Sequence, residues 1–374
     1  MKLPSAEVIP YALPFKRPYV TARGRLEQRE MVLLRLRSEE GIIGLGEAVP
    51  LSLRGGATLV TVVRELEALT QLDVLDEAAI EAAAPSLSAP SRCAATTALL
   101  DLRSRAVAAG DHLASAPGEV RPTFPPLSEG KVDRTPPDRG VAVPCNATLV
   151  AGEPGAVAEE ARAWAAEGFT TFKLKLGSGD DVEQVRAVRQ AIGMEARIRV
   201  DVNAAWDLRT AKRSLAALES FALELAEQPV DSLEEMAELA AATSIPLAAD
   251  ESVASWADAE RAASMGACKF TGIKLSKVGG PEEAVAIADV LPAYVSSALD
   301  GPVGIAAAAQ VAQTLAASEH PERLDLAHGL ATQRLFASTV AAVECELRDG
   351  LLHLPPGPGL GVEIDEDALA AHRL

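Results

Sequence analysis

The sequence predicts a two-domain protein of mixed α/β and α+β class, in which a modified (β/α)8 barrel of seven to eight units is joined to an α+β capping domain. From about residue 141 to residue 340, short apolar runs alternate with segments of helical period, and charged residues stand where several of the runs end. The first 115 residues instead show paired strand patterns followed by helical ones. A chain of 374 residues with 48% hydrophobic residues has enough apolar side chains for both cores.

The N-terminal α+β domain is expected over residues 1–115. Residues 31–37 and 42–47 have the pattern of neighbouring strands, and the short turn between them predicts a hairpin. Residues 58–110 are rich in Ala and Leu with a helical period. We expect residues of about 341–374 to fold back and complete this domain.

A Pro-rich segment at residues 116–140 separates the two domains. Proline, glycine and charged residues replace the apolar periods there, and such a composition disfavours a packed element. We interpret the segment as a linker or loop.

The barrel is expected over residues 141–340. Helical periods at 156–167 and 181–192 separate apolar runs that have the length of strands. The expected strands lie near 143–148, 171–176, 197–201, 222–227, 246–250, 270–274, 293–297 and 324–328. Such a series is typical of a parallel barrel, whose reactive side chains gather at the carboxyl ends of the strands.

Charge and composition exclude several functional classes. The net charge of −18 argues against a general nucleic-acid-binding protein, because neutralising phosphates requires clustered Lys and Arg. The four cysteines form no C-x-x-C pair and the five histidines have no metal-binding spacing, so neither zinc nor a disulfide is expected. No apolar stretch is long enough to span a membrane. We expect a soluble cytoplasmic protein that acts on a small-molecule carboxylate, and the oligomeric state is left open.

Three carboxylates recur at spacings of 26 and 23 residues, which is about one strand-plus-helix unit. Asp201, Glu227 and Asp250 each stand where an apolar run ends. A helix N-cap or a solvated loop explains any one of them, but three at successive strand ends predict a metal site. Carboxylate oxygens are preferred ligands of Mg²⁺, with Mn²⁺ as a substitute.

Lysines bracket these carboxylates. Lys173 and Lys175 share one face of a strand, and Lys274 ends a later strand, where it would face Lys175 across the barrel. Two neighbouring ammonium groups repel each other, and a nearby metal cation adds to the effect, so one lysine is expected to have a lowered pKa and to act as a base. A solvated edge strand would give the same Lys-x-Lys pattern.

Four polar residues are candidates for binding the substrate. Arg199 and Asn203 share the strand face of Asp201 and would orient either the metal ligands or the substrate. Ser296 and Ser297 follow a later strand, where their hydroxyls and the following N–H groups are placed to hold a carboxylate or a carbonyl. Ordinary hydrogen bonding within a loop explains the two serines equally well.

Together these motifs resemble the enolase superfamily, in its muconate-lactonising-enzyme subgroup. The resemblance rests on the motifs Lys173-x-Lys175, Asp201-x-Asn203, Glu227-Gln228-Pro229, Asp250-Glu251-Ser252 and Lys274. Gly44-x-Gly46-Glu47-Ala48 is similar to the strand-end signature of the capping domain in that family. Within the subgroup, residues 295–300 and the Arg199-x-Asp201-x-Asn203 pattern look most like the o-succinylbenzoate synthase family, in its actinobacterial form.

The resemblance implies a magnesium-dependent lyase of menaquinone biosynthesis. The three carboxylates would hold Mg²⁺, and Lys175 would remove the proton α to a substrate carboxylate. The metal and Lys274 would stabilise the resulting enediolate, and loss of a β-hydroxyl as water would leave an aromatic ring that bears a succinyl group. Lys173 would tune Lys175.

Other activities of the same subgroup use the same lysines. An N-succinylamino acid racemase would exchange protons through Lys175 and Lys274 on opposite faces of its substrate, and a muconate cycloisomerase is a second alternative. A dipeptide epimerase is less favoured, because no Asp-x-Asp stands near the eighth strand. A barrel that only binds metal or ligand is a remote alternative, since such a protein has no need of two bases beside a metal.

Two stretches of the capping domain, around residues 17–25 and 51–56, are expected to close the site. A loop charge such as Arg23 would meet the succinyl carboxylate, although a solvated loop arginine is the simpler interpretation. Asp300-Gly301-Pro302 departs from the pattern expected of the family and leaves the substrate contacts around it open.

Overall fold

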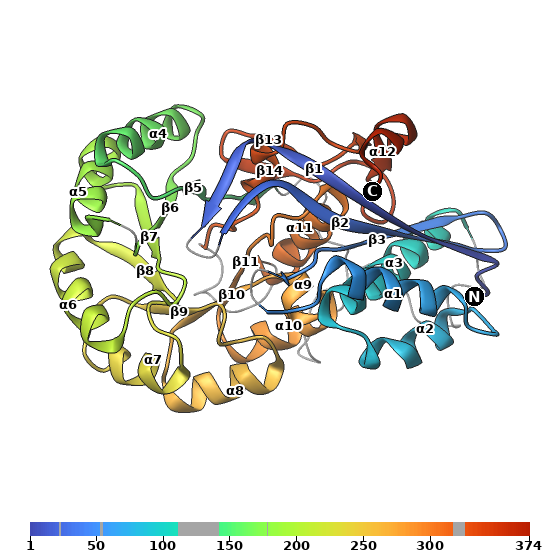
Figure 1. Ribbon diagram of the computed structural model, residues 1–374, viewed down its shortest axis with the longest axis horizontal. Helices are drawn as coiled ribbons and strands as arrows, with labels where there is room; N and C mark the ends of the chain where they lie inside the picture. Colours follow the sequence, from blue (N-terminus) through green and yellow to red (C-terminus); the bar gives the residue numbers. More distant parts are fainter. Residues whose placement is uncertain (22–23, 53–54, 111–141, 178, 317–325) are drawn as a thin grey trace.

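The computed structural model describes residues 1–21, 24–52, 55–110, 142–177, 179–316 and 326–374. Within these residues a curled parallel sheet ringed by helices lies beside an antiparallel sheet with its own helices (Figure 1). The predicted fold class, a modified barrel with an α+β capping domain, is confirmed. The Pro-rich segment at 116–140 and Arg23 lie outside the described residues.

The antiparallel sheet has the strand order β1–β2–β3, with β1 at Ser5–Thr21, β2 at Gly24–Arg37 and β3 at Ile43–Ala48. The predicted hairpin between β2 and β3 is present, and the N–H of Gly41 closes its turn by donating to the carbonyl of Ser38 at 3.0 Å. β1 has no counterpart among the expected strands. Because β1 pairs with β2 up to Thr21 and Gly24, the described part of the 17–25 stretch is strand and not the loop expected there.

Helices cover one face of this sheet, as the helical period at 58–110 predicts. They are α1 (Leu59–Thr70), α2 (Glu77–Ala83), the short 3₁₀ helix η2 (Ala84–Ser86) and α3 (Ala89–Ala108). The apolar core between sheet and helices includes Val32 and Leu34 of β2, Leu66 of α1 and Leu102 of α3.

The Gly-x-Gly pair in β3 is explained by the close approach of α3. A Cβ atom on Gly44 would overlap the carbonyl oxygen of Ala98, and a Cβ on Gly46 would overlap that of Ala94. Strand and helix backbones therefore touch directly, which only glycine permits. This contact fixes the end of β3, where Glu47 stands.

Within the described residues, the parallel sheet has seven strands in chain order. They are β5 (Ala147–Leu149), β6 (Thr171–Lys175), β7 (Arg197–Asp201), β8 (Leu223–Glu227), β9 (Leu247–Ala249), β10 (Phe270–Ile273) and β11 (Ala293–Val295). Each strand pairs in parallel with the next one along the chain. This arrangement puts all carboxyl ends of the strands at one mouth of the barrel.

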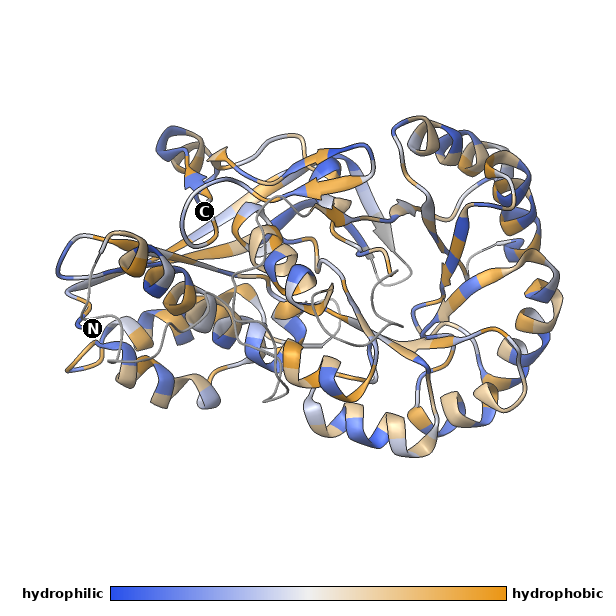
Figure 2. Cartoon of the chain, turned by 180° about the vertical axis from the view of Figure 1, so that it is seen from behind, coloured by the Kyte–Doolittle hydropathy of each residue, from blue (hydrophilic) through white to orange (hydrophobic). Residues whose placement is uncertain are grey.

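Helices connect these strands and form the outer ring (Figure 1). They are α4 (Pro154–Ala166), α5 (Asp181–Ile192), α6 (Leu208–Leu218) with the 3₁₀ helix η4 (Glu219–Phe221), α7 (Leu233–Ala240), α8 (Trp256–Met265), α9 (Leu275–Val278), α10 (Pro281–Val290) and α11 (Pro302–Ala316). Figure 2 shows both hydrophilic and hydrophobic residues along the ring helices. Such two-faced helices bury one side on the sheet and leave the other in water.

The eighth barrel position is filled by residues 326–330 without a regular strand. Gly329 forms an isolated parallel bridge with Ser296 on one side, and His328 forms one with Cys145 on the other. The segment therefore joins the two edges of the sheet and closes the barrel. The expected eighth strand is reduced to these two bridges in its described part, because only one residue on each side pairs.

The C-terminal segment crosses back from the barrel to the antiparallel sheet. It contains η6 (Ala331–Leu335), β12 (Ala341–Val343), β13 (Glu346–Arg348), β14 (Leu351–His353), β15 (Glu363–Ile364) and α12 (Glu366–His372), and β14 also pairs with β4 (Val143–Pro144). The N–H of Leu374 donates to the carbonyl of Pro10 at 3.0 Å, and Arg35 forms an ion pair with Glu366 at 2.7 Å. The chain end thus lies against β1 and β2, and the domain boundaries drawn from the sequence stay predictions.

Within the described ranges, the helices are all too short or too polar to cross a membrane.

We expect Gly46→Ala to lower the free energy of unfolding of the N-terminal domain by about 1–3 kcal/mol, because the added methyl group overlaps α3. Gly155→Ala is the matched control, since nothing lies within 4 Å of a Cβ there and alanine favours helix α4. Differential scanning calorimetry of the two variants checks the expectation. Equal melting temperatures would contradict the close packing of β3 on α3.

Candidate active site

The three predicted metal-binding carboxylates lie together at the mouth of the barrel. Asp201 and Glu227 are the last residues of β7 and β8 and are in register with each other, and Asp250 directly follows β9. All three side chains are at most 1% exposed. Buried carboxylates are costly unless cations or hydrogen bonds compensate them, so their surroundings determine what the site does.

Two lysines of β6 supply part of that compensation. Lys173 places its Nζ atom 2.8 Å from Asp201 Oδ2 and 2.5 Å from Glu227 Oε2. Lys175 lies 2.6 Å from the same Oδ2 atom of Asp201. The Lys175 side chain is 24% exposed and that of Lys173 only 7%, so Lys175 is the one that reaches the open mouth.

The third carboxylate, Asp250, is compensated by lysines that follow the neighbouring strand β10. Lys274 forms an ion pair with Asp250, and Lys277 lies 2.9 Å from Asp250 Oδ1. Lys277 also donates to the carbonyl of Gly272 at 3.2 Å. Because β6 and β10 are four strands apart in an eight-position barrel, Lys175 and Lys274 face each other across the mouth.

The expected lowering of a lysine pKa in the β6 pair is contradicted. Burial by itself would lower the pKa of Lys175 and Lys173 would lower it further, but the attraction of Asp201 outweighs both and the net shift is upward. The pKa of Lys173 is also raised, because Asp201, Glu227 and Asp250 together outweigh its burial. Repulsion between the two ammonium groups is present, as predicted, but the attraction of the carboxylates outweighs it.

Two other charged groups of the site have lowered pKa values. Burial by itself would raise the pKa of Asp201, but Lys173 and Lys175 hold it below its ordinary value. The pKa of Lys277 is lowered, because burial outweighs the attraction of Asp250 and Lys274 repels it. Lys277 is therefore the lysine of this site that fits the predicted direction.

The donor set fits a hard divalent cation such as Mg²⁺. In the described arrangement, no three His, Cys, Asp or Glu side chains are close enough together to hold a metal ion, and lysine ammonium groups pair with all three acids. Even so, Glu227 Oε1 is buried without a hydrogen-bond partner, while Tyr294 donates to its other oxygen at 2.7 Å. An unpaired buried carboxylate oxygen beside two further carboxylates is a site that attracts a cation.

The two residues that flank Asp201 on its strand face differ in position. Asn203 accepts a hydrogen bond from Lys175 at 2.8 Å and donates to Glu251 at 3.2 Å, so it lies at the mouth and orients the lysine. Arg199 is fully buried inside the barrel, where it forms an ion pair with Glu224 and lies 4.8 Å above the ring of Tyr294. These contacts give Arg199 a supporting position beneath the site, and its predicted contact with substrate stays a prediction.

The two predicted serines lie at the mouth but are already engaged. Ser296 is 5% exposed and continues β11 in the bridge to Gly329. Ser297 donates its hydroxyl to Asp300 at 2.7 Å and accepts from the N–H of the same residue at 2.8 Å. Loop hydrogen bonding therefore accounts for Ser297, and a role of either serine in substrate binding remains a prediction.

Several residues of the site were not predicted from the sequence. Tyr294 shares the strand face of Ser296, and Lys277 stands one helical turn after Lys274, so parity and helical spacing were available signals. Gln228 accepts from the N–H of Asp250 at 2.8 Å and so fixes that acid. The β1–β2 hairpin extends to the barrel mouth (Figure 1), and Tyr19 of β1 raises the pKa of Lys175 there. That approach is a tertiary contact with no local signal.

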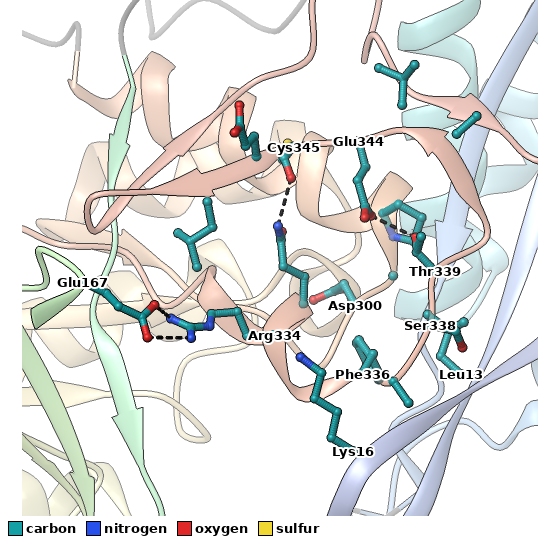
Figure 3. A pocket seen from close by; sticks show the side chains of 18 residues that line it. Leu13, Lys16, Glu167, Asp300, Arg334, Phe336, Ser338, Thr339, Glu344 and Cys345 are labelled. Atoms are coloured by element: carbon teal, nitrogen blue, oxygen red, sulfur yellow. Dashed lines mark hydrogen bonds and ion pairs between the residues drawn. The ribbon is translucent and has the colours of Figure 1, made fainter. Parts of the chain in front are cut away.

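A separate cavity of about 850 Å³ lies between β1 and the C-terminal segment. Figure 3 shows two pairs among its charged and polar side chains, Arg334 with Glu167 and Thr339 with Glu344. None of the three carboxylates or the lysines at the mouth lines it. This cavity is thus distinct from the barrel mouth, and we assign the chemistry to the mouth because the buried carboxylates and their lysine partners are there.

Family models match both parts of the chain. A model described as mandelate racemase / muconate lactonizing enzyme, N-terminal domain, matches residues 5–109. A second model, described as enolase C-terminal domain-like, matches residues 156–368.

Characterised relatives with several activities are similar to this chain. An o-succinylbenzoate synthase of Thermobifida fusca is 40% identical over 205 residues, which cover 53% of this chain and 62% of that protein, so the match spans less than two thirds of the relative. Muconate cycloisomerase 1 of Acinetobacter baylyi is 26% identical over 98% of both chains. The structure of a dipeptide epimerase from Enterococcus faecalis, complexed with Mg and the dipeptide L-Leu-L-Tyr, has a TM-score of 0.83 at 26% identity and covers 97% of this chain and 100% of its own.

We expect Arg199→Ala to destabilise the barrel by about 3 kcal/mol or more, because it leaves Glu224 and the carbonyl of Ala327 without their buried partner. Arg199→Lys is expected to restore only part of the loss, since an ammonium group cannot make both contacts in the same plane. Thermal unfolding with Arg209→Ala as an exposed control checks this. A fully stable Arg199→Ala protein that binds substrate poorly would instead place Arg199 on the substrate.

Proposed function

The chain belongs to the enolase superfamily, in its muconate-lactonising-enzyme subgroup, and from that premise we propose that it is an o-succinylbenzoate synthase. The reaction is the magnesium-dependent dehydration of 2-succinyl-6-hydroxy-2,4-cyclohexadiene-1-carboxylate to 2-succinylbenzoate, a step of menaquinone biosynthesis. The enzyme is accordingly a lyase that breaks a carbon–oxygen bond.

One observation carries the proposal: Lys175 and Lys274 face each other across a mouth that holds three buried carboxylates. Removal of a proton next to a substrate carboxylate needs a base and a strong positive field for the charge that develops. Lysines on two sides of the substrate provide both. A protein that only bound a ligand would have no use for this arrangement.

Lys175 has the position of the base. It is the more exposed lysine of β6, and Asn203 and Asp201 fix its Nζ atom at 2.8 Å and 2.6 Å. When Asp201 is engaged elsewhere, burial and the neighbouring Lys173 both disfavour the charged form of Lys175. The free amine then takes the proton from the ring carbon that bears the carboxylate.

The remaining steps balance without another reactant. The electron pair of the broken C–H bond moves into the carboxylate, and the ammonium group of Lys274 stabilises the enediolate. As the pair returns to the ring, the β-hydroxyl leaves with the proton from Lys175 as water. The lysine regains its starting form, and the ring becomes aromatic, which favours the products.

Asp201, Glu227 and Asp250 are the residues that would hold the divalent cation, Mg²⁺ or in its place Mn²⁺. Such an ion supplies positive charge that neutralises the three carboxylates and the charge that develops on the substrate carboxylate. Glu227, whose Oε1 atom is buried without a partner, is ready to accept it.

The choice of synthase among the activities of the subgroup rests on fewer residues. The Val295–Asp300 segment resembles that of synthases, and the Thermobifida fusca relative named as a synthase is 40% identical over about half of this chain. N-succinylamino acid racemase and muconate cycloisomerase remain the alternatives, because the same two lysines serve proton exchange and lactone chemistry. Epimerase activity is less favoured, because no Asp-x-Asp stands near the eighth strand.

The decisive experiment supplies the cyclohexadiene precursor with Mg²⁺ and follows formation of 2-succinylbenzoate by absorbance. An N-succinylamino acid and cis,cis-muconate are tested in parallel. Dehydration in the presence of Mg²⁺, abolished by a chelator and restored by added metal, is the expected result. Racemisation or lactonisation without dehydration would refute the synthase and favour the corresponding alternative.

We expect Lys175→Ala and Lys274→Ala each to lower kcat by about 10³-fold or more, because each removes a group that acts on the reacting carbon or its charge. Mg²⁺ binding, measured by isothermal titration calorimetry, is expected to persist in both. Lys212→Ala, which removes an exposed lysine paired with Glu238 on the outer ring, is the matched control and is expected to be fully active. Full activity in either mouth variant would remove that lysine from the mechanism.

A further inference from the structure

A second group of buried ionisable side chains lies between the capping sheet and the barrel. Glu47 stands near the end of β3, in the Gly-x-Gly-Glu motif, and is 2% exposed. Asp300 stands in the loop between β11 and α11 and is 5% exposed. The proposed reaction uses neither residue. Two acids buried this deeply need a reason, because burial of a carboxylate is costly.

Glu47 ties the two sheets together. One carboxylate oxygen accepts from the hydroxyl of Tyr11 on β1 at 2.7 Å, and the other accepts from the N–H of Gly301 at 2.6 Å. Gly301 belongs to the barrel, and a Cβ atom there would overlap the Tyr11 hydroxyl. Glu47 thus receives hydrogen bonds from both domains.

Asp300 and Arg29 hold the loop that precedes Gly301. Asp300 accepts from the hydroxyl of Ser297 at 2.7 Å and from the N–H of Ala298 at 2.6 Å. Arg29, on β2 of the capping sheet, donates to the carbonyl of Ala298 at 3.1 Å and to that of Pro50 at 2.7 Å. Contacts from the barrel and from the capping domain therefore both hold the loop, and they meet at Ala298.

The backbone of this loop is strained, which is an independent sign that the contacts are needed. Leu299 has φ of +67°, a left-handed conformation that a branched side chain rarely adopts. Such a conformation persists only where the surrounding contacts over-determine it, and it is frequent at functional loops. Leu299 stands between the anchored residues Ala298 and Asp300.

The two carboxyl groups are close enough to influence each other. A Cβ atom on Gly304 would lie 2.7 Å from Glu47 Oε1 and 3.1 Å from Asp300 Oδ1, so both oxygens border the same small space. Burial, with the charge of Asp300 added, raises the pKa of Glu47 to about 7. Burial also raises the pKa of Asp300.

The other titratable groups around the pair come from four elements. Tyr11 of β1 and Cys93 of α3 both have pKa values raised by burial and by this pair, so they stay neutral near pH 7. Arg29 of β2 is cationic and faces Asp300, and Glu344 of the C-terminal segment acts on Tyr11 from further away.

We propose that Glu47, Asp300 and Arg29 form an interdomain clamp that holds the strained loop 297–301 in place, and that the clamp loosens when the carboxyl pair loses its proton. The three are positioning residues, because they act on the loop and not on a substrate. One consequence rests on the proposed function: the loop carries Ser297, so the clamp would couple docking of the capping domain to the predicted substrate contacts.

The direction of the pH dependence follows from the raised pKa of Glu47. The folded protein binds this proton more tightly than the unfolded chain, whose carboxyl has an ordinary pKa of 4.5. The stabilising contribution is complete below about pH 4.5 and is lost as the pH rises through about 7. Loosening therefore occurs on the alkaline side.

Hydrogen–deuterium exchange of the full chain tests the clamp without any substrate, so its failure is distinguishable from failure of the proposed function. For wild type, we expect the protection of the amides of residues 297–301, corrected for intrinsic exchange, to fall about tenfold between about pH 6 and about pH 8. Glu47→Gln keeps a carbonyl acceptor but cannot ionise, and its protection is expected to be independent of pH. Glu47→Ala is expected to lose protection at both values, and exposed Glu160→Gln serves as the control that behaves as wild type.

Two results would overturn the clamp. One is unchanged protection of the loop in Glu47→Ala. The other is a Glu47→Gln protein that retains the pH dependence of wild type, and this second result decides the matter even if the alanine variant does not fold.

Discussion

Charge compensation inside the barrel mouth is the constraint on which this structure depends. Three carboxylates, Asp201, Glu227 and Asp250, are withdrawn almost completely from water. Each is met by at least one lysine ammonium group at ion-pair distance. Removing one partner from such a network leaves an isolated buried charge, which costs about 3–5 kcal/mol. The site is therefore stable only as a set.

The same compensation explains how the site is prepared for chemistry. Lysines that neutralise acids in the resting arrangement are the groups that a bound cation would release, because both compete for the same carboxylate oxygens. Lys175 is held by one oxygen of Asp201 and by Asn203, and it is the more exposed of the two β6 lysines. Lys173, bridged between Asp201 and Glu227, has no such freedom.

Buried acids between the capping domain and the barrel are compensated in a different way. At the barrel mouth, acids and lysines alternate, whereas Glu47 and Asp300 lie close to each other and are held mainly by hydrogen bonds. The lysines hold the pKa of Asp201 below its ordinary value, whereas burial and the neighbouring Asp300 raise that of Glu47. The two groups are linked through β11 and its loop, since Tyr294 contacts Glu227 while Ser297 contacts Asp300.

The sequence by itself determined the barrel and the identity of its charged strand ends. Strand and helix periods are local, and a residue at the end of a parallel strand reaches the mouth in any such barrel, so Asp201, Glu227 and Lys175 were placed correctly at strand ends. Only the tertiary structure decided which charges pair, and hence the upward shift of the pKa of Lys175. It also decided that, in the part of the chain the structure describes, residues 326–330 close the barrel through two isolated bridges. The partners of Glu47 are 36 and 254 residues away in the chain, and no local pattern encodes a contact over such distances.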